Sequence, residues 1–202
     1  MGCLKFIIKV VIVVLAIIGF KSLGGWDYLK ENVHFFEKPT QEALLEKAKS
    51  IADLSKIPDE YEIDRTADFF GYKAVAAEHK ASGQKLIILD PGKSIPVTKK
   101  DFKDGGINKK LKELNDKIAY QFVRLENLTV TKQGTFKTMG QTVPYARFEA
   151  DVVNMPFKHM EGMIAVADIE TDDGVKSRIL LAANSDDKYS QIITEQFFHK
   201  VK

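Results

Sequence analysis

The sequence predicts an α+β fold, with an antiparallel sheet of about six strands packed with two or three helices and preceded by an N-terminal transmembrane helix. Residues that alternate between apolar and polar occur in two runs, within about residues 61–89 and 128–183. Segments with apolar residues at helical spacing stand before, between and after those runs. Such segregated runs favour an antiparallel sheet with helices packed on it, whereas regular alternation of strand and helix would favour a parallel sheet.

The first predicted helix begins at Thr40 and ends near Leu54. Pro39 interrupts the preceding chain, and the Thr40 hydroxyl can accept a hydrogen bond from the first turn of a helix. The apolar residues that follow at helical spacing are Leu44, Leu45, Ala48, Ile51 and Ala52. This spacing predicts an amphipathic helix that packs one face on the core.

The first run of strands predicts a meander of two or three strands. Apolar side chains alternate with others from Tyr61 to Ile63 and again from Tyr72 to Ala76. A turn signal at Ser82-Gly83 leads into a short apolar strand at residues 85–89, which Asp90-Pro91-Gly92 ends.

The longest helix signal follows Gly105-Gly106, which interrupt the chain. Apolar residues then recur at steps of three and four, at Ile107, Leu111, Leu114, Ile118, Phe122 and Leu125. This stripe predicts one helix over residues 107–125.

The clearest strand runs from Ala146 to Val152. Apolar side chains there alternate strictly with Arg147, Glu149 and Asp151, so one face is expected to be dry and the other wet. The remaining strands are predicted at Leu128–Val130, Met163–Ile169 and Val175–Ala183, with turns at Gly134, Gly140 and Asp172-Asp173-Gly174.

The last predicted helix is capped by Ser185-Asp186-Asp187. Its apolar face is expected to carry Tyr189, Ile192, Ile193, Phe197 and Val201. Neighbouring side chains diverge in a helix, so the doublet Phe197-Phe198 is expected to send one ring to the core and the other elsewhere.

The element order, the strand entry from Gly140 to Val143, the terminal hairpin and the closing helix with Tyr189, Ile192, Phe197 and Phe198 together resemble the PsbP/Mog1/DcrB-like α/β sandwich superfamily. The resemblance covers about residues 58–200 and rests on element order, without a diagnostic motif. Members of that superfamily are mostly binding or accessory proteins, and several are exported and membrane-associated. The resemblance implies such a role and transfers no ligand residue to this chain.

The N-terminal segment predicts a membrane anchor. Seventeen residues from Leu4 to Phe20 are apolar except for Lys5 and Lys9, and a helix of that length spans about 26 Å of a hydrocarbon core about 30 Å thick. A segment that is apolar on every face is typical of a targeting or membrane helix rather than of a core helix. Lys21 follows the segment, and Trp26 is suited to the membrane interface.

The chain is therefore divided into a signal anchor at residues 1–26, a juxtamembrane connector at 27–39 and a single globular α+β domain at 40–202. The positive-inside bias of the lysines predicts a cytoplasmic N-terminus and an extracytoplasmic domain. Cleavage near Gly24 is the alternative and would release a secreted protein. Lipidation of Cys3 is not predicted. The N-terminal residues do not match the N-myristoylation pattern, and Cys3 does not stand where the cysteine of a bacterial lipoprotein signal would.

The charge distribution argues against nucleic acid as a partner. Three of the 30 basic residues lie in the first 25 residues, which leaves 27 basic against 28 acidic residues in the remainder. Arginine, which recognises phosphates and base edges best, occurs only at Arg65, Arg124, Arg147 and Arg178. The partners expected instead are the lipid bilayer and either a protein or a small apolar ligand.

The sequence contains no G-x-S-x-G or H-E-x-x-H motif, and no catalytic residue or cofactor is predicted. A membrane-anchored binding or accessory module is therefore the leading hypothesis. The competing hypothesis is an enzyme that draws its acid–base groups from scattered residues such as Glu78, His79, Glu149 and Asp151. Those groups would have to converge in a cleft for their pKa values to be tuned.

One segment has the composition of a metal site. Met155, His159, Met160 and Met163 offer three thioethers and one imidazole within nine residues, and such soft donors suit Cu(I). The same methionines are also suited to fill gaps in a core, and the core interpretation is favoured.

Overall fold

The computed structural model describes residues 40–202 apart from 70–71, 94, 104, 119–123, 154–157, 172–173 and 186. The predicted signal anchor, with Lys5, Lys9, Lys21 and Trp26, and the connector lie outside the described residues. Among the residues that are described, no helix is long and apolar enough to cross a membrane.

The described residues form an α+β fold, as predicted, around a single antiparallel sheet. Its seven strands are one more than the six expected, and they lie in the order β1-β2-β3-β7-β6-β5-β4. The strands are β1 (Tyr61–Phe69), β2 (Tyr72–His79), β3 (Lys85–Asp90), β4 (Arg124–Thr138), β5 (Gln141–Val153), β6 (His159–Thr171) and β7 (Gly174–Ser185).

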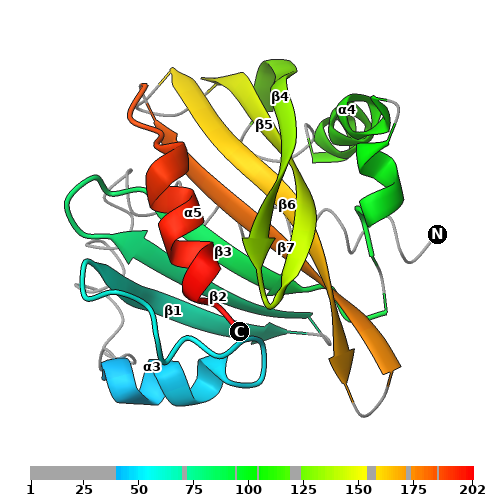
Figure 1. The fold of residues 1–202 in the computed structure, drawn as a ribbon. Coiled ribbons are helices and arrows are strands. Elements are labelled where there is room, and N and C mark those ends of the chain that lie inside the picture. Colours follow the sequence, from blue (N-terminus) through cyan, green and yellow to red (C-terminus); the bar gives the residue numbers. More distant parts are fainter. Residues whose placement is uncertain are drawn as a thin grey trace.

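Helices cover both faces of this sheet (Figure 1). The face here called the front packs against α3 (Gln41–Ala48) and α5 (Gln191–Lys200). The opposite face, here called the back, packs against α4 (Gly106–Ile118) and the short 3-10 helix η1 (Lys99–Phe102). Apolar side chains therefore form two cores, one on each side of the sheet.

The front core is centred on the two phenylalanines of α5. Phe197 and Phe198 are 1% and 0% exposed, and their rings meet edge to face with centroids 5.2 Å apart. The expectation that one ring of this doublet points away from the core is wrong. Phe198 is also buried because the end of α5 lies against β4, where the Thr138 hydroxyl donates a hydrogen bond of 2.6 Å to the Phe198 carbonyl.

Two predicted helices end or begin elsewhere than expected. Thr40 caps α3 as predicted, with its hydroxyl accepting from the Ala43 amide at 3.3 Å, but the helix ends at Ala48 rather than near Leu54. The α4 helix is described as far as Ile118, Phe122 lies outside the described residues, and Leu125, the last residue of the predicted stripe, lies in strand β4 rather than in the helix. Side-chain spacing alone did not reveal this change from helix to strand, because an apolar residue at position 125 fits both a helical stripe and the alternation of a strand.

The start of α5 also differs from the prediction. Ser190 is its N-cap, and its hydroxyl accepts a hydrogen bond from the Ile193 amide. Ser185, the predicted cap, instead pairs with Met160 at the end of β7. Pairing with β6 keeps this segment extended for longer than its capping residues suggest.

Gly140 and Gly134 show the two uses of glycine in this sheet. Gly140 has a φ of 69° in the β4–β5 turn, as predicted. Gly134 is not in a turn: it lies within β4, and a Cβ there would be 2.9 Å from the ring of Tyr145 on β5. Glycine is needed at this position because the tyrosine ring lies across the strand.

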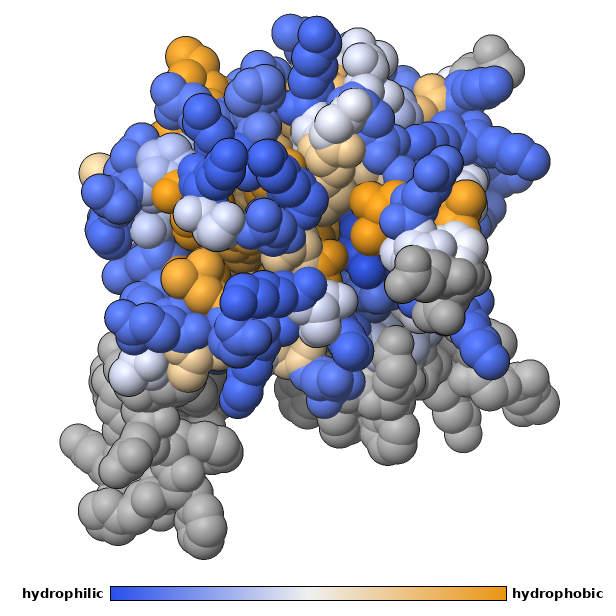
Figure 2. All heavy atoms as spheres, turned by 60° about the horizontal axis from the view of Figure 1, so that its bottom comes forward, coloured by the Kyte–Doolittle hydropathy of each residue, from blue (hydrophilic) through white to orange (hydrophobic). Residues whose placement is uncertain are grey.

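The face of the molecule that Figure 2 shows is mostly hydrophilic. The face in Figure 2 carries small, separate apolar patches among hydrophilic residues. The large apolar side chains that are exposed among the described residues are Ile95, Val175 and Ile192, which belong to different segments of the chain.

Candidate functional site

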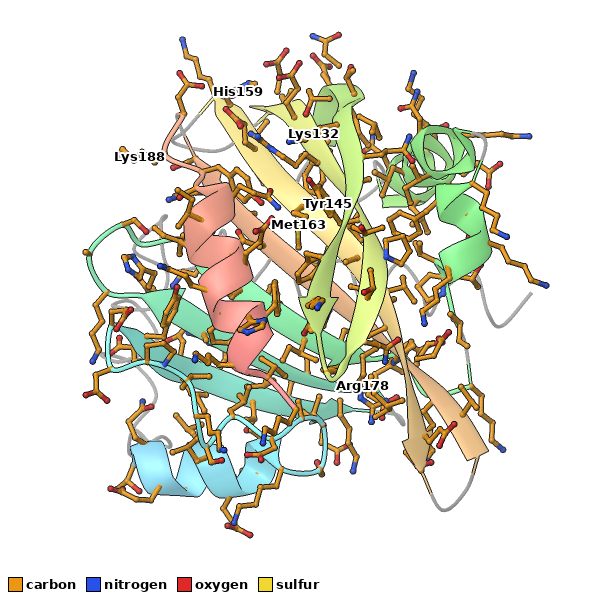
Figure 3. All side chains as sticks on the ribbon, in the orientation of Figure 1. Lys132, Tyr145, His159, Met163, Arg178 and Lys188 are labelled. Carbon is orange, nitrogen blue, oxygen red and sulfur yellow. The ribbon has the colours of Figure 1, made fainter. Side chains whose placement is uncertain are left out.

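The candidate site is a group of charged side chains on the front face, where β5 and β6 extend past the first turn of α5 (Figure 3). We call it the front polar cluster. It consists of Arg147, Glu149, Asp151, His159, Glu161 and Asp187.

The front polar cluster follows from strand alternation. Val143 and Tyr145 are buried in the front core, so Arg147, Glu149 and Asp151 on the same strand face the same side. The predicted dry face of this strand is confirmed by Ala146, Ala150 and Val152, which are buried on the back, whereas the front is wet only from Arg147 onward.

Pairing of β5 with β6 decides which charges meet. Glu149 lies directly opposite Glu161, and Asp151 lies directly opposite His159. Like charges directly opposite each other destabilise a strand pair, whereas opposite charges stabilise it. The Glu149–Glu161 pair therefore sets two carboxylates opposite each other, and Arg147 ion-pairs with one of them.

His159 is oriented by a carboxylate. Its Nδ1 atom lies 3.5 Å from Asp151 Oδ1, and the Asn127 side-chain amide donates a hydrogen bond of 2.6 Å to the other oxygen of that carboxylate. The Asn127 hydrogen bond and then the His159 contact lower the pKa of Asp151 below its ordinary value. Asn127 reaches this position through a β-bulge in β4, where it has a φ of 53°.

Glu161 is held by Arg147. The Arg147 Nη2 atom donates to Glu161 Oε2 at 2.8 Å, and the guanidinium carbon lies 5.1 Å from the centroid of the Tyr189 ring. Burial raises the pKa of Tyr189 to about 12, so its hydroxyl stays neutral at physiological pH. That hydroxyl donates to Gln191 and accepts from Thr194, both on α5.

Asp187 completes the cluster from the segment between β7 and α5. Its Oδ1 atom lies 4.0 Å from His159 Nε2, the ring nitrogen that does not face Asp151. One ligating atom each of His159, Glu161 and Asp187 can be chosen so that all three lie within 4.8 Å of one another. The group therefore offers one imidazole nitrogen and two carboxylate oxygens at a single location.

The residues that suggested a copper site are not brought together. Met160 is 4% exposed and packs on the back with Val152 and Ala183, whereas Met163 is 0% exposed in the front core. His159 shares the front face with Met163 but lies four residues before it on β6, about 13 Å away at the usual rise of a strand. Met155 lies outside the described residues. The two described thioethers thus fill the two cores.

The scattered acid–base residues do not converge either. Glu78 and His79 lie on β2, which is four strand positions from β5, or about 19 Å at the usual strand spacing. His79 stacks edge to face with Tyr61 on the front, and Glu78, the neighbouring residue, faces the back. Glu149 and Asp151 are therefore separated from them by most of the sheet.

Sequence reasoning named His159, Glu149 and Asp151 but missed four residues that complete their surroundings. Asn127, Glu161 and Tyr189 were not considered for the site, and Asp187 was interpreted only as a helix cap. The signal for Glu161 was its spacing of two from His159, which places both on one face of a strand. Nothing in the sequence predicts the contacts of Asn127 or Asp187, because they depend on strand register and on the position of α5.

The comparisons with known proteins assign no family to the chain. No protein-family model matches the chain, and no curated protein shows significant similarity to it.

Proposed function

We propose that the protein is a binding or accessory module that its N-terminal segment anchors to a membrane, with the globular domain on the extracytoplasmic side. The apolar run from Leu4 to Phe20, headed by Lys5 and Lys9, supports the anchor and its orientation. The PsbP-like element order, which stays a prediction, supports an accessory rather than a catalytic role.

The observation that carries the binding role is the front polar cluster. It presents both signs of charge from two paired strands, and its members are only partly covered: the side chains of Arg147, His159 and Asp151 are 29%, 32% and 48% exposed. Side chains on paired strands are well positioned, so such a surface can recognise a partner with little loss of conformational entropy on binding.

This surface favours a polar partner over the apolar ligand that the sequence suggested. The phenylalanine doublet of α5 is buried in the front core and cannot form a docking patch. A partner at the front polar cluster would be recognised by charge and hydrogen bonds.

Cysteine accessibility in intact cells tests the location. Cys3 is the single cysteine, so the unmodified chain reports the N-terminus, and a Cys3→Ser/Lys202→Cys variant reports the other end of the domain. A membrane-impermeant maleimide should label the variant and leave the unmodified chain unlabelled until the cells are opened. The opposite labelling pattern would refute the proposed orientation, and a soluble protein that lacks Cys3 would establish the cleaved form.

Site-specific photocrosslinking in membranes tests the binding role. A photoreactive residue replacing Glu149 should yield a discrete crosslinked product, while the same residue at Thr142, an exposed position on the same strand, should not. Equal products from both positions, or none from Glu149, would argue against the front polar cluster as the contact surface.

A further inference from the structure

We propose that His159, Glu161 and Asp187 bind a divalent transition-metal ion of the zinc class. The inference goes beyond the proposed binding role and does not depend on the membrane location. It rests on the donor set, on the orientation of the imidazole and on the local charge.

The donor set suits a borderline divalent ion. Zinc is bound by imidazole nitrogens and carboxylate oxygens, and sites that exchange ligands commonly use three protein ligands and leave a fourth position for water or a partner. His159, Glu161 and Asp187 supply such a set. The absence of a described thioether from the cluster distinguishes it from a soft Cu(I) site.

The spacing is close to what a metal requires. In a tetrahedral site with bonds of about 2.1 Å, two ligand atoms lie about 3.4 Å apart. The His159 Nε2 and Asp187 Oδ1 atoms are 4.0 Å apart, and the Asp187 side chain is 85% exposed. A small rotation of this exposed carboxylate therefore closes the site while His159 and Glu161 stay on their strand.

The imidazole is oriented as in a metal site. A ligating histidine commonly donates its other ring N–H to a carboxylate, which selects the tautomer and the ring direction. Asp151 is placed to accept from Nδ1 and is itself held by Asn127. The lone pair of the neutral ring then lies on Nε2, which faces Asp187.

The local charge attracts a cation. The cluster holds four carboxylates, those of Glu149, Asp151, Glu161 and Asp187, and the guanidinium of Arg147 pairs with one of them, Glu161. A divalent ion would relieve the repulsion between Glu149 and Glu161 on paired strands. Arg147 holds Glu161 through Oε2, so a metal and the guanidinium can share this carboxylate by binding different oxygens.

The test is titration of the untagged full-length chain, in detergent and stripped of metal, with zinc chloride in a calorimeter. We expect one saturable zinc ion per chain. Both His159→Gln and Asp187→Asn should lower the zinc affinity by at least about tenfold, and Asp151→Asn by about tenfold to a hundredfold through loss of histidine orientation.

His199→Gln is the matched control, because His199 is exposed on the last turn of α5, away from the cluster. It should bind zinc like the unmodified chain. Asp187→Asn changes an exposed residue outside the strands, so it tests the site even if changes on β6 reduce folding. The absence of saturable binding, an unchanged affinity in both His159→Gln and Asp187→Asn, or equally tight binding of Mg²⁺ would each overturn the proposal.

Discussion

Arg178 and Arg147 lie on the same face of the sheet and have opposite environments. Arg178 on β7 is 3% exposed; it donates from Nε to the Ile51 carbonyl at 2.9 Å and from Nη1 to Asp90 Oδ2 at 3.0 Å. Burial lowers the pKa of its guanidinium, and the charge of Asp90 opposes that shift. Arg147 on β5 keeps contact with water while it pairs with Glu161.

The difference separates a structural ion pair from one that is available for binding. Asp90 and Arg178 join β3, β7 and the segment after α3, and the desolvated carboxylate and guanidinium depend on each other. The Arg147–Glu161 pair is solvated, so its partners can exchange one contact for another at small cost. A ligand is expected at the second pair and not at the first.

The largest expected effect is that of removing the buried guanidinium. Arg178→Met should lower the free energy of unfolding by about 3–5 kcal/mol, because it leaves the largely covered Asp90 carboxylate without its charged partner. Urea denaturation measures this change. The double variant Arg178→Met/Asp90→Leu should recover part of the loss, and a single variant as stable as the unmodified chain would contradict the structural role.

A smaller loss is expected from the contact that holds the start of α5 beside the front polar cluster. Gln84 is fully buried; its amide donates to Thr194 Oγ1 at 2.7 Å, and its Oε1 accepts from the Ser190 amide at 2.7 Å. Gln84→Met should lower the free energy of unfolding by about 1–3 kcal/mol, because the half-buried Ser190 amide and the buried Thr194 hydroxyl lose a hydrogen-bond partner.

Hydrogen exchange distinguishes this explanation from a general loss of packing. In Gln84→Met, the amides at the start of α5 should exchange faster than those at the centre of β7. Uniformly faster exchange in both elements would show that Gln84 does not act specifically on the helix start.

The exposed arginine should matter far less for stability. Arg147→Met is expected to lower the free energy of unfolding by no more than about 1 kcal/mol, since partly solvated ion pairs and cation–π contacts each contribute little. Urea denaturation of this variant beside Arg178→Met measures the contrast directly. Equal losses in the two variants would remove the distinction between the structural pair and the available one.

The smallest effect concerns the pKa of Asp151. A carboxylate whose folded-state pKa is lowered adds stability above its unfolded pKa of about 4, and that stability is lost as the pH falls through the folded-state pKa. Asn127→Gly removes the main cause of the shift and keeps a residue suited to the positive φ, so the pKa of Asp151 should rise toward its ordinary value.

An NMR titration of the Asp151 carboxyl carbon follows this change. Thr142→Ala, at an exposed position near the other end of β5, is the control and should leave the titration of Asp151 unchanged. A titration of Asp151 that is unaltered in Asn127→Gly would show that the hydrogen bond seen here does not act on the carboxylate.

Local patterns were sufficient for much of the fold. Strict alternation predicted β5 and its two faces, and the Thr40 cap predicted the start of α3. The predictions failed where a distant residue controls the backbone. Gly134 has the sequence signal of a turn, yet it lies within β4, where the Tyr145 side chain occupies the space that a Cβ would fill. Ser185 has the signal of a cap, yet pairing with Met160 keeps it extended.

The candidate site was predictable only in part, for the same reason. The spacing of residues places Glu149 with Asp151 and His159 with Glu161, since each pair is separated by two positions on a strand. Which of these residues meet across the sheet depends on the register of β5 with β6, and a shift by one residue would send every side chain to the other face.

The α+β class, the alternation of β5 and the apolar N-terminal segment follow from the chain alone, because each depends on neighbours within a few residues. The chain alone does not predict that Asp187 lies beside His159, that Met160 and Met163 pack in separate cores, or that Arg178 is buried. These features arise from the packing of elements that are far apart in sequence, because strand order and the position of α5 on the sheet decide which residues meet.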